Sequence, residues 1–277
     1  MMVLLVACTG CAQLLGLDST KFDYKDAMVD APSVCDGAPA CTSTTGRSVC
    51  GIVIDTGANA GTPLRVASPT GGACTTADGP CALTVYGQTK ADFFAGASTQ
   101  VAGTIDDCGR FVVPDLDANA ADVAVVLAAA SNVTTATLVL ERPTSPGTDT
   151  NVLAYAVATT TAASWGSQLS PASPPTISSG YLVTQADAAG APLAGESVWV
   201  NGGPVAGPPT VPWSAYFTDR PFGALDPAQT MTAAGGTSLV LPATGSFMLG
   251  GARTGKTCKQ ITVQLVTDVL IHVTLSC

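Results

Sequence analysis

Short stretches in which apolar and polar positions alternate recur along most of the chain, and they predict β-strands. Their period is two, they are rich in β-branched residues, and Gly, Pro, Asn or Asp interrupts them after about eight to twelve residues. They include VCGIVI, ALTVY, RFVVP, DVAVVL and TATLVL in the first half, then SVWV, TSLVLP, SFMLG, KQITVQLV and VLIHVTL in the second. This pattern is typical of an all-β sandwich.

A single segment between these two groups of strands has the pattern of a helix. It begins at Thr160 or Thr161, either of which can serve as the N-cap, and it ends at Gln168, shortly before a Ser-Pro pair. Trp165 lies on this segment. We expect its ring to pack against a face of a sandwich, because core packing is the commonest role of such a side chain.

The chain contains a faint internal repeat. VIDTGANAGTPLRV (53–66) and QADAAGAPLAGESV (185–198) share a strand end, an aspartate, a glycine-containing turn and a Pro-Leu pair. Later, the pattern T-x₆-FVVP of Thr104–Pro114 corresponds to T-x₆-LVLP of Thr232–Pro242. Matched residues are separated by 128 to 132 positions throughout. A nearly constant offset predicts two copies of one domain.

The repeated motif resembles the transthyretin-like β-sandwich of carboxypeptidase regulatory-like domains. The resemblance is carried by Val53–Val66, by Thr104, Gly109 and Phe111, and by Asp187–Val198. It implies two Greek-key sandwiches joined by the short helix. Members of this family are mostly accessory or adhesive modules without catalytic residues, so the resemblance also implies a binding or scaffolding role.

The N-terminus has the pattern of an export signal. MMVLLVACTGC is a short apolar run followed by small residues and cysteine, too short for the roughly 20 apolar residues that span a bilayer. This segment resembles the signal of a bacterial lipoprotein, in which cleavage before a cysteine precedes acylation of that cysteine. Cys11 is the favoured anchor and Cys8 the alternative. By the same resemblance, Ala12 in place of aspartate implies the outer membrane, with a periplasmic or surface-exposed orientation.

The predicted organisation has five parts. The segment after the anchor mixes Asp, Pro, Ser, Thr and Ala with little periodicity, which is typical of a disordered stalk. The parts are a lipoprotein signal segment (1–11), a flexible stalk (12–47), a first sandwich domain (48–158), a helix with its linker (159–178) and a second sandwich domain (179–277).

The cysteines favour an oxidising compartment. Eight remain once Cys8 and Cys11 are set aside, and an even set in an exported chain indicates disulfide bonds. We expect Cys258 and Cys277 to face each other across a hairpin that turns at Thr267–Asp268. No C-x-x-C spacing occurs and His272 is the only histidine, so we predict no zinc site. The four expected pairs are Cys35–Cys41, Cys50–Cys108, Cys74–Cys81 and Cys258–Cys277.

The composition argues against nucleic acid as a partner. Hydrophobic residues make up 47% of the 277 residues, enough for a buried core, while only 11% are charged. The formal charge is −9, and no stretch groups lysines or arginines with aromatic residues. A chain of this kind has no surface with which to neutralise a phosphate backbone.

GGARTGKT (250–257) fits the phosphate-binding pattern G-x-x-x-x-G-K-[ST]. A phosphate-binding loop requires a helix directly after the lysine, because the helix N-terminus holds the phosphates. Here the following CKQITVQLV alternates with period two and predicts a strand. We therefore predict a glycine-rich hairpin loop and no bound nucleotide.

Two further groups of residues have side chains of a catalytic or metal-binding type. His272 is predicted on the polar side of the last strand, with no neighbour that could make it a general base. Asp106 and Asp107 offer carboxylates for calcium or for a hydrolase, but the other oxygen ligands are not apparent and a solvated turn is the favoured interpretation.

These observations together favour a non-enzymatic, lipid-anchored cell-envelope protein that acts as a binding or structural module, without cofactor or metal. Its partners would be the membrane, through the lipid anchor, and a protein or a glycan. One alternative is a carbohydrate-binding module whose exposed rings stack on sugars, with Trp199, Trp213, Tyr216 and Phe217 as candidates. The other is an enzyme, either nucleotide-dependent through Lys256 or a hydrolase that uses the paired aspartates.

Overall fold

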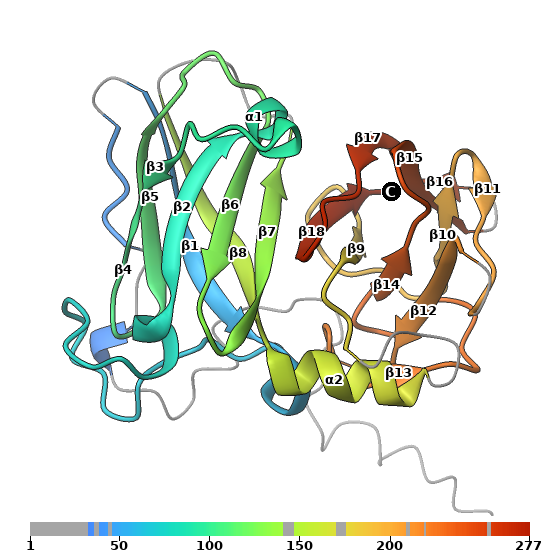
Figure 1. Ribbon diagram of the computed structural model, residues 1–277, viewed down its shortest axis with the longest axis horizontal. Coiled ribbons are helices and arrows are strands. Elements are labelled where there is room, and N and C mark those ends of the chain that lie inside the picture. The colour runs from blue at the N-terminus through green and yellow to red at the C-terminus, as the bar shows by residue number, and fades with distance from the viewer. Residues whose placement is uncertain are drawn as a thin grey trace, which may run out of the picture. The chain divides into compact units, whose positions relative to one another are not determined.

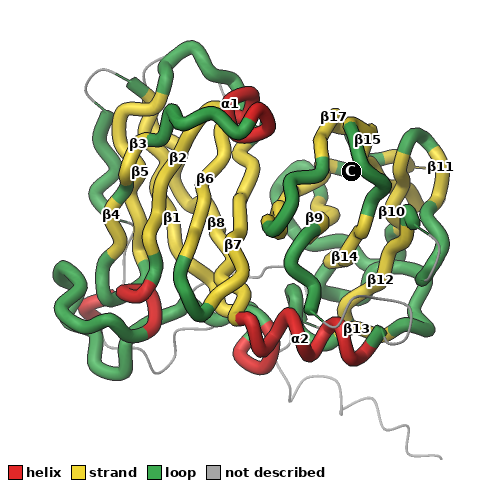
Figure 2. Tube along the Cα trace, viewed as in Figure 1, coloured by secondary structure: helices red, strands yellow, loops and turns green. Residues whose placement is uncertain are grey.

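The structure is a computed structural model, and it describes residues 33–35, 39–43, 46–140, 147–169, 176–208, 211–218, 220–253 and 256–277. The predicted signal segment and most of the predicted stalk lie outside the described residues. Strands dominate, as the yellow segments of Figure 2 show, so the prediction of an all-β sandwich fold is confirmed. No helix in the described part of the chain has the length and hydrophobicity needed to cross a bilayer.

The first half of the chain forms a sandwich of two four-stranded layers (Figure 1). In one layer the central strand runs antiparallel to one neighbour and parallel to the other. The order in that layer is β4 (Thr104–Ile105), β5 (Arg110–Leu116), β1 (Arg47–Asp55) and β8 (Gly147–Ala158). The order in the facing layer is β3 (Val101–Ala102), β2 (Thr84–Thr89), β6 (Val123–Ala128) and β7 (Asn132–Val139).

The second half repeats this arrangement. Here β9 takes the place of β1, because it pairs antiparallel with β14 and parallel with β18. The first layer is ordered β13 (Leu225–Asp226), β12 (Trp213–Phe217), β14 (Thr237–Leu241), β9 (Gly180–Ala186) and β18 (Val269–Ser276). The second layer contains β11 (Gly203–Pro204), β10 (Ser197–Val200) and β15 (Ser246–Arg253), and β15 pairs with both β16 (Lys256–Thr257) and β17 (Ile261–Gln264).

The sequence repeat performs the same structural role in both halves. The Leu64 amide donates a hydrogen bond of 2.8 Å to the Val53 carbonyl, and the Leu193 amide donates one of 2.8 Å to the Gln185 carbonyl. In each case the Pro-Leu segment folds back on the strand that precedes the turn. The repeated residues therefore close the same loop beside β1 and β9.

The two halves are joined by main-chain pairing. Residues 134–137 of β7 lie parallel to residues 269–272 of β18, so one 13-stranded sheet runs through both. Ala31–Cys277 form one compact unit. The predicted domain boundaries consequently stay a prediction.

The expected hairpin of the last two strands is wrong. β17 pairs with β15 in one layer, whereas β18 lies between β7 and β9 in the other. Leu270, Ile271 and Val273 are all fully buried, so β18 is apolar on both faces. A strand of this kind suits the centre of a sheet with parallel neighbours better than a half-exposed hairpin.

Two α-helices interrupt the strands in the described part of the chain. α2 (Thr159–Gln168) ends where expected but begins earlier, after Ala158, and neither Thr160 nor Thr161 serves as N-cap. Trp165 is 1% exposed and packs in the core, as expected.

α1 (Lys90–Ala95) was not predicted, although its sequence contains both end signals. The Thr89 side chain accepts a hydrogen bond of 3.1 Å from the Asp92 amide, and Gly96 adopts the left-handed conformation that ends a helix. Shorter 3-10 turns occupy η2 (Ser33–Cys35), η3 (Gly57–Asn59) and η4 (Gly79–Ala82).

Candidate functional site

Four disulfide bonds cross-link the described residues. Cys74–Cys81 and Cys258–Cys277 form as expected. The other four cysteines exchange partners relative to the expectation, and the observed pairs are Cys35–Cys108 and Cys41–Cys50.

The ladder between β1 and β5 explains the exchange. Cys50 of β1 lies opposite Val112 of β5. Cys108 precedes Val112 by four residues, which is roughly 13 Å along an extended chain. That separation is about twice the Cα–Cα distance that a disulfide bond can bridge. Cys50 therefore bonds to Cys41, and Cys108 bonds to Cys35.

The GGARTGKT motif forms a β-hairpin. Gly250 and Gly251 belong to β15, and β16 returns antiparallel to it with Ala252 opposite Thr257. Strand β17 follows, as predicted. Residues 254 and 255 lie outside the described residues. Because no helix N-terminus follows Lys256, the motif lacks the element that holds phosphates in a nucleotide-binding loop.

The two cationic side chains of this motif, Arg253 and Lys256, interact with the buried carboxylate of Glu196 instead of with a phosphate. Glu196 is fully buried, and its Oε1 lies 3.2 Å from Nε of Arg253. Burial raises the pKa of Glu196, while the charges of Arg253 and Lys256 oppose that rise. No motif in the sequence points to Glu196. Only the register, which places Ser197 opposite Ala252, shows that Glu196 and Arg253 are neighbours across the ladder.

Glu196 also lies beside the Cys258–Cys277 disulfide bond. Its carboxylate and the two sulfur atoms are within 4.8 Å of one another, a spacing compatible with a metal ion. Both sulfur atoms are bonded to each other, so neither offers a thiolate ligand. The cluster in its oxidised form is therefore a poor metal site.

Asp106 and Asp107 lie at a turn, as expected, but they hold a loop in place and Asp107 is buried rather than solvated. Asp106 accepts hydrogen bonds from the amides of Cys108 and Arg110 and pairs with Arg110 Nε at 2.6 Å. Asp107 is 6% exposed and accepts from the Thr70 amide, the Thr70 hydroxyl and the Gly71 amide. Burial raises the pKa of Asp107, but these hydrogen bonds outweigh it and the net direction is downward. Both carboxylates are thus engaged by protein donors.

The expected placement of His272 on a polar face is also wrong. Its ring is 5% exposed and lies 4.5 Å from the ring of Tyr155 and 5.6 Å from that of Phe222, measured between centroids. Nε2 is 3.1 Å from the Thr184 hydroxyl, and Nδ1 has no hydrogen-bond partner among the described residues. Burial lowers the pKa of His272 to about 3. The imidazole is therefore neutral and shielded from solvent.

Most of the candidate sugar-stacking rings are buried. Trp213 is 1% exposed, Tyr216 3% and Phe217 1%. The Tyr216 hydroxyl accepts a hydrogen bond of 3.0 Å from the Val198 amide inside the sandwich. Trp199 alone of the four is partly exposed. These four residues therefore do not form the exposed aromatic row that a carbohydrate-binding module would present.

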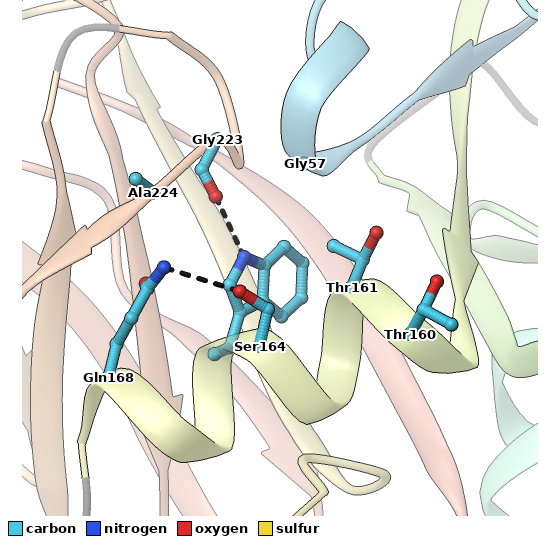
Figure 3. Close-up of a pocket in the computed structure, with 8 residues that line it drawn as sticks. Gly57, Thr160, Thr161, Ser164, Gln168, Gly223 and Ala224 are labelled. Carbon is cyan, nitrogen blue, oxygen red and sulfur yellow. Dashed lines mark hydrogen bonds between the residues drawn. The ribbon is translucent and has the colours of Figure 1, made fainter.

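A cavity of about 350 Å³ opens beside α2 (Figure 3). Trp165 donates a hydrogen bond of 2.7 Å to the Gly223 carbonyl at its centre, and the hydroxyl of Ser164 and the amide of Gln168 lie 3.4 Å apart on the helix face. No charged side chain lines it. Trp165 lines the cavity but is almost fully buried, so its ring offers little surface to a ligand. The remaining lining residues are Gly57, Thr160, Thr161 and Ala224.

No protein-family model matches the chain, and no curated protein sequence matches it. Among solved structures, it is similar to a streptococcal ancillary pilin, with 9% identity, 83% of this chain and 68% of that chain covered, and a TM-score of 0.23. It is also similar to the Bacillus anthracis TIE protein, with 10% identity, 84% of this chain and 34% of that chain covered, and a TM-score of 0.23. A third similar structure is a mutant shaft pilin SpaA of Lactobacillus rhamnosus GG, with 11% identity, 84% of this chain and 98% of that chain covered, and a TM-score of 0.21. Values this low support no inference about the function of this chain.

Proposed function

We propose that this chain is a non-enzymatic protein of the bacterial cell envelope, anchored to the outer membrane by acyl chains on Cys11. Its duplicated β-sandwich acts as a binding or structural module. The observation that carries the proposal is the set of four disulfide bonds. Disulfide bonds of this density are typical of exported proteins, because the cytosol keeps thiols reduced.

The bond between Cys35 and Cys108 links this argument to the predicted anchor. It ties the segment that precedes the first strand to the loop before β5, at a sequence separation of 73 residues. A tether that begins near Cys11 would then be joined to the sandwich at two points, by the main chain at β1 and by the Cys35–Cys108 bond at the loop before β5. This arrangement suits a module held at a membrane.

The chemistry of the candidate catalytic groups supports a binding or structural role over an enzymatic one. His272 is buried and neutral, the paired aspartates hold a loop, and Arg253 and Lys256 face Glu196. A general base or a nucleophile needs access to a substrate. The shared loop geometry of the two halves also supports kinship with carboxypeptidase regulatory-like domains, whose accessory role agrees with this proposal.

The anchor is tested by mass spectrometry of the protein purified from envelope fractions. We expect the mature N-terminus at Cys11 with acyl chains attached, and recovery in the outer-membrane fraction. Cys11→Ser should abolish acylation and release the protein from the membrane. Cys8→Ser is the matched control and should change neither result. An unprocessed Met1 with a free thiol at Cys11 would contradict the proposal.

A further inference from the structure

The layer formed by β10, β11, β15 and β17 has an outer face with an unusual composition. Directly opposed residues of antiparallel strands point to the same side of a sheet. Trp199 lies opposite Pro204 on one side and Gly250 on the other, so these three residues form one row across the strands. Gln260 extends the row, because its Cγ is 2.9 Å from the position that a Cβ on Gly250 would occupy.

The neighbouring rows of the same face are polar or small. Met248 lies opposite Thr262, and both are exposed. On the other side of the Trp199 row, Ser197 lies opposite Ala252, and Ala252 lies opposite Thr257. The Trp199 indole donates a hydrogen bond of 3.2 Å to the Ser197 hydroxyl, which fixes the ring along its strand. The ring therefore has a defined orientation on a face that faces solvent.

This outer face carries no charged residue among the rows described above, although the protein has a formal charge of −9. The charged residues in and beside the same strands alternate onto the other side of the sheet. Glu196 precedes Ser197, and Arg253 lies opposite Lys256, so all three belong to the inner side of the ladder, where Glu196 is buried. An uncharged ligand would meet no unpaired charge on the outer face, whereas an ionic ligand would find no counter-charge there.

We propose that this outer face binds an uncharged glycan, with the Trp199 ring stacked on a sugar ring and the side chains of Gln260 and Thr262 hydrogen-bonded to its hydroxyl groups. Gly250 lies beside Trp199 and has no side chain, so the Gln260 side chain packs over it and its amide lies next to the Trp199 row. Trp199 and Met248 are the only large apolar side chains in these rows, which is less apolar area than the core of a protein interface requires. The inference rests on the proposed binding role and specifies its ligand class.

The test uses the tryptophan fluorescence of the purified full chain. Trp165 and Trp213 are each 1% exposed, so Trp199 is the tryptophan that a soluble ligand can reach. Cellohexaose, maltohexaose and chitohexaose are titrated separately, and each affinity is also measured by calorimetry. At least one should change the emission and bind. Trp199→Ala should weaken that binding at least tenfold, and Met231→Ala, which removes an exposed apolar side chain elsewhere, should leave it unchanged.

Gln260→Glu provides a second variant in case Trp199→Ala does not fold, because Gln260 is exposed and the substitution adds only a charge. It should also weaken binding. The inference is overturned if none of the three oligosaccharides binds, or if binding is equal in wild type and in both face variants. A protein partner whose capture requires Trp199 and is unaffected by the sugars would also overturn it. The assay does not depend on acylation of Cys11, so its failure leaves the membrane-anchor proposal standing.

Discussion

Acid should destabilise this protein through one buried side chain. His272 is the only histidine in the chain, and its ring packs against those of Tyr155 and Phe222. Burial lowers its pKa from 6.5 to about 3 in the folded protein. In the unfolded chain the side chain is solvated and its pKa returns to about 6.5. Protonation therefore favours the unfolded chain.

The size of the effect follows from these two pKa values. Above pH 6.5 the side chain is neutral in both states and adds no pH dependence. Below pH 6.5 the unfolded chain binds a proton that the folded protein excludes, so the free energy of unfolding falls by about 1.4 kcal/mol per pH unit. The loss is about 2 kcal/mol at pH 5 and about 4 kcal/mol near pH 3, against a typical total stability of about 5 to 15 kcal/mol.

The assay is urea unfolding at pH 7, 6 and 5, for the wild type and for His272→Gln. Glutamine can keep the polar contact that His272 Nε2 makes with the Thr184 hydroxyl, but it does not titrate. Between pH 7 and pH 5 the wild type should lose about 2 kcal/mol more stability than the variant. An equal pH dependence in the two proteins would refute the reasoning. So would a titration of the ring, followed by NMR, with its midpoint near 6.5.

Two further predictions concern stability. Burial raises the pKa of Glu196 above its unfolded value of 4.5, so the stability that its protonation contributes is lost as pH rises above 4.5. Glu196→Gln should therefore be more stable than the wild type at pH 7 and equal to it at pH 4. Thermal unfolding measures both. Replacing Cys35 and Cys108 by alanine should lower the free energy of unfolding by about 4 kcal/mol, against about 2.5 kcal/mol for Cys41 and Cys50, because the first bond closes the longer loop. Urea titration measures both, and peptide mapping that finds Cys35 bonded to Cys41 would contradict the second prediction.

Local patterns in the sequence were sufficient for a large part of the fold. Alternation identified the strands, and the T-x-x-D pattern with a following glycine would have identified α1 as well. Period-two alternation after Lys256 excluded the helix of a nucleotide-binding loop, and the structure has strand β17 there. The bond Cys74–Cys81 was predicted from the short separation of its cysteines, but the same reasoning wrongly paired Cys35 with Cys41. The bond Cys258–Cys277 was predicted correctly, although the hairpin on which that prediction depended is absent. These features depend on residues that are close in the sequence.

The features that decide the candidate sites depend on which strands lie side by side, and only the tertiary structure shows that. The chain places β18 between β7 and β9, and this buries His272 on a strand that appeared to have a polar face. Register across β10 and β15 brings Glu196 to Arg253 and places Trp199 beside Gly250. Strand pairing joins residues far apart in the chain, so its energy comes from packing and backbone hydrogen bonds that no short stretch of sequence contains. The sequence determined the strands, and the pairing of the strands determined which side chains meet.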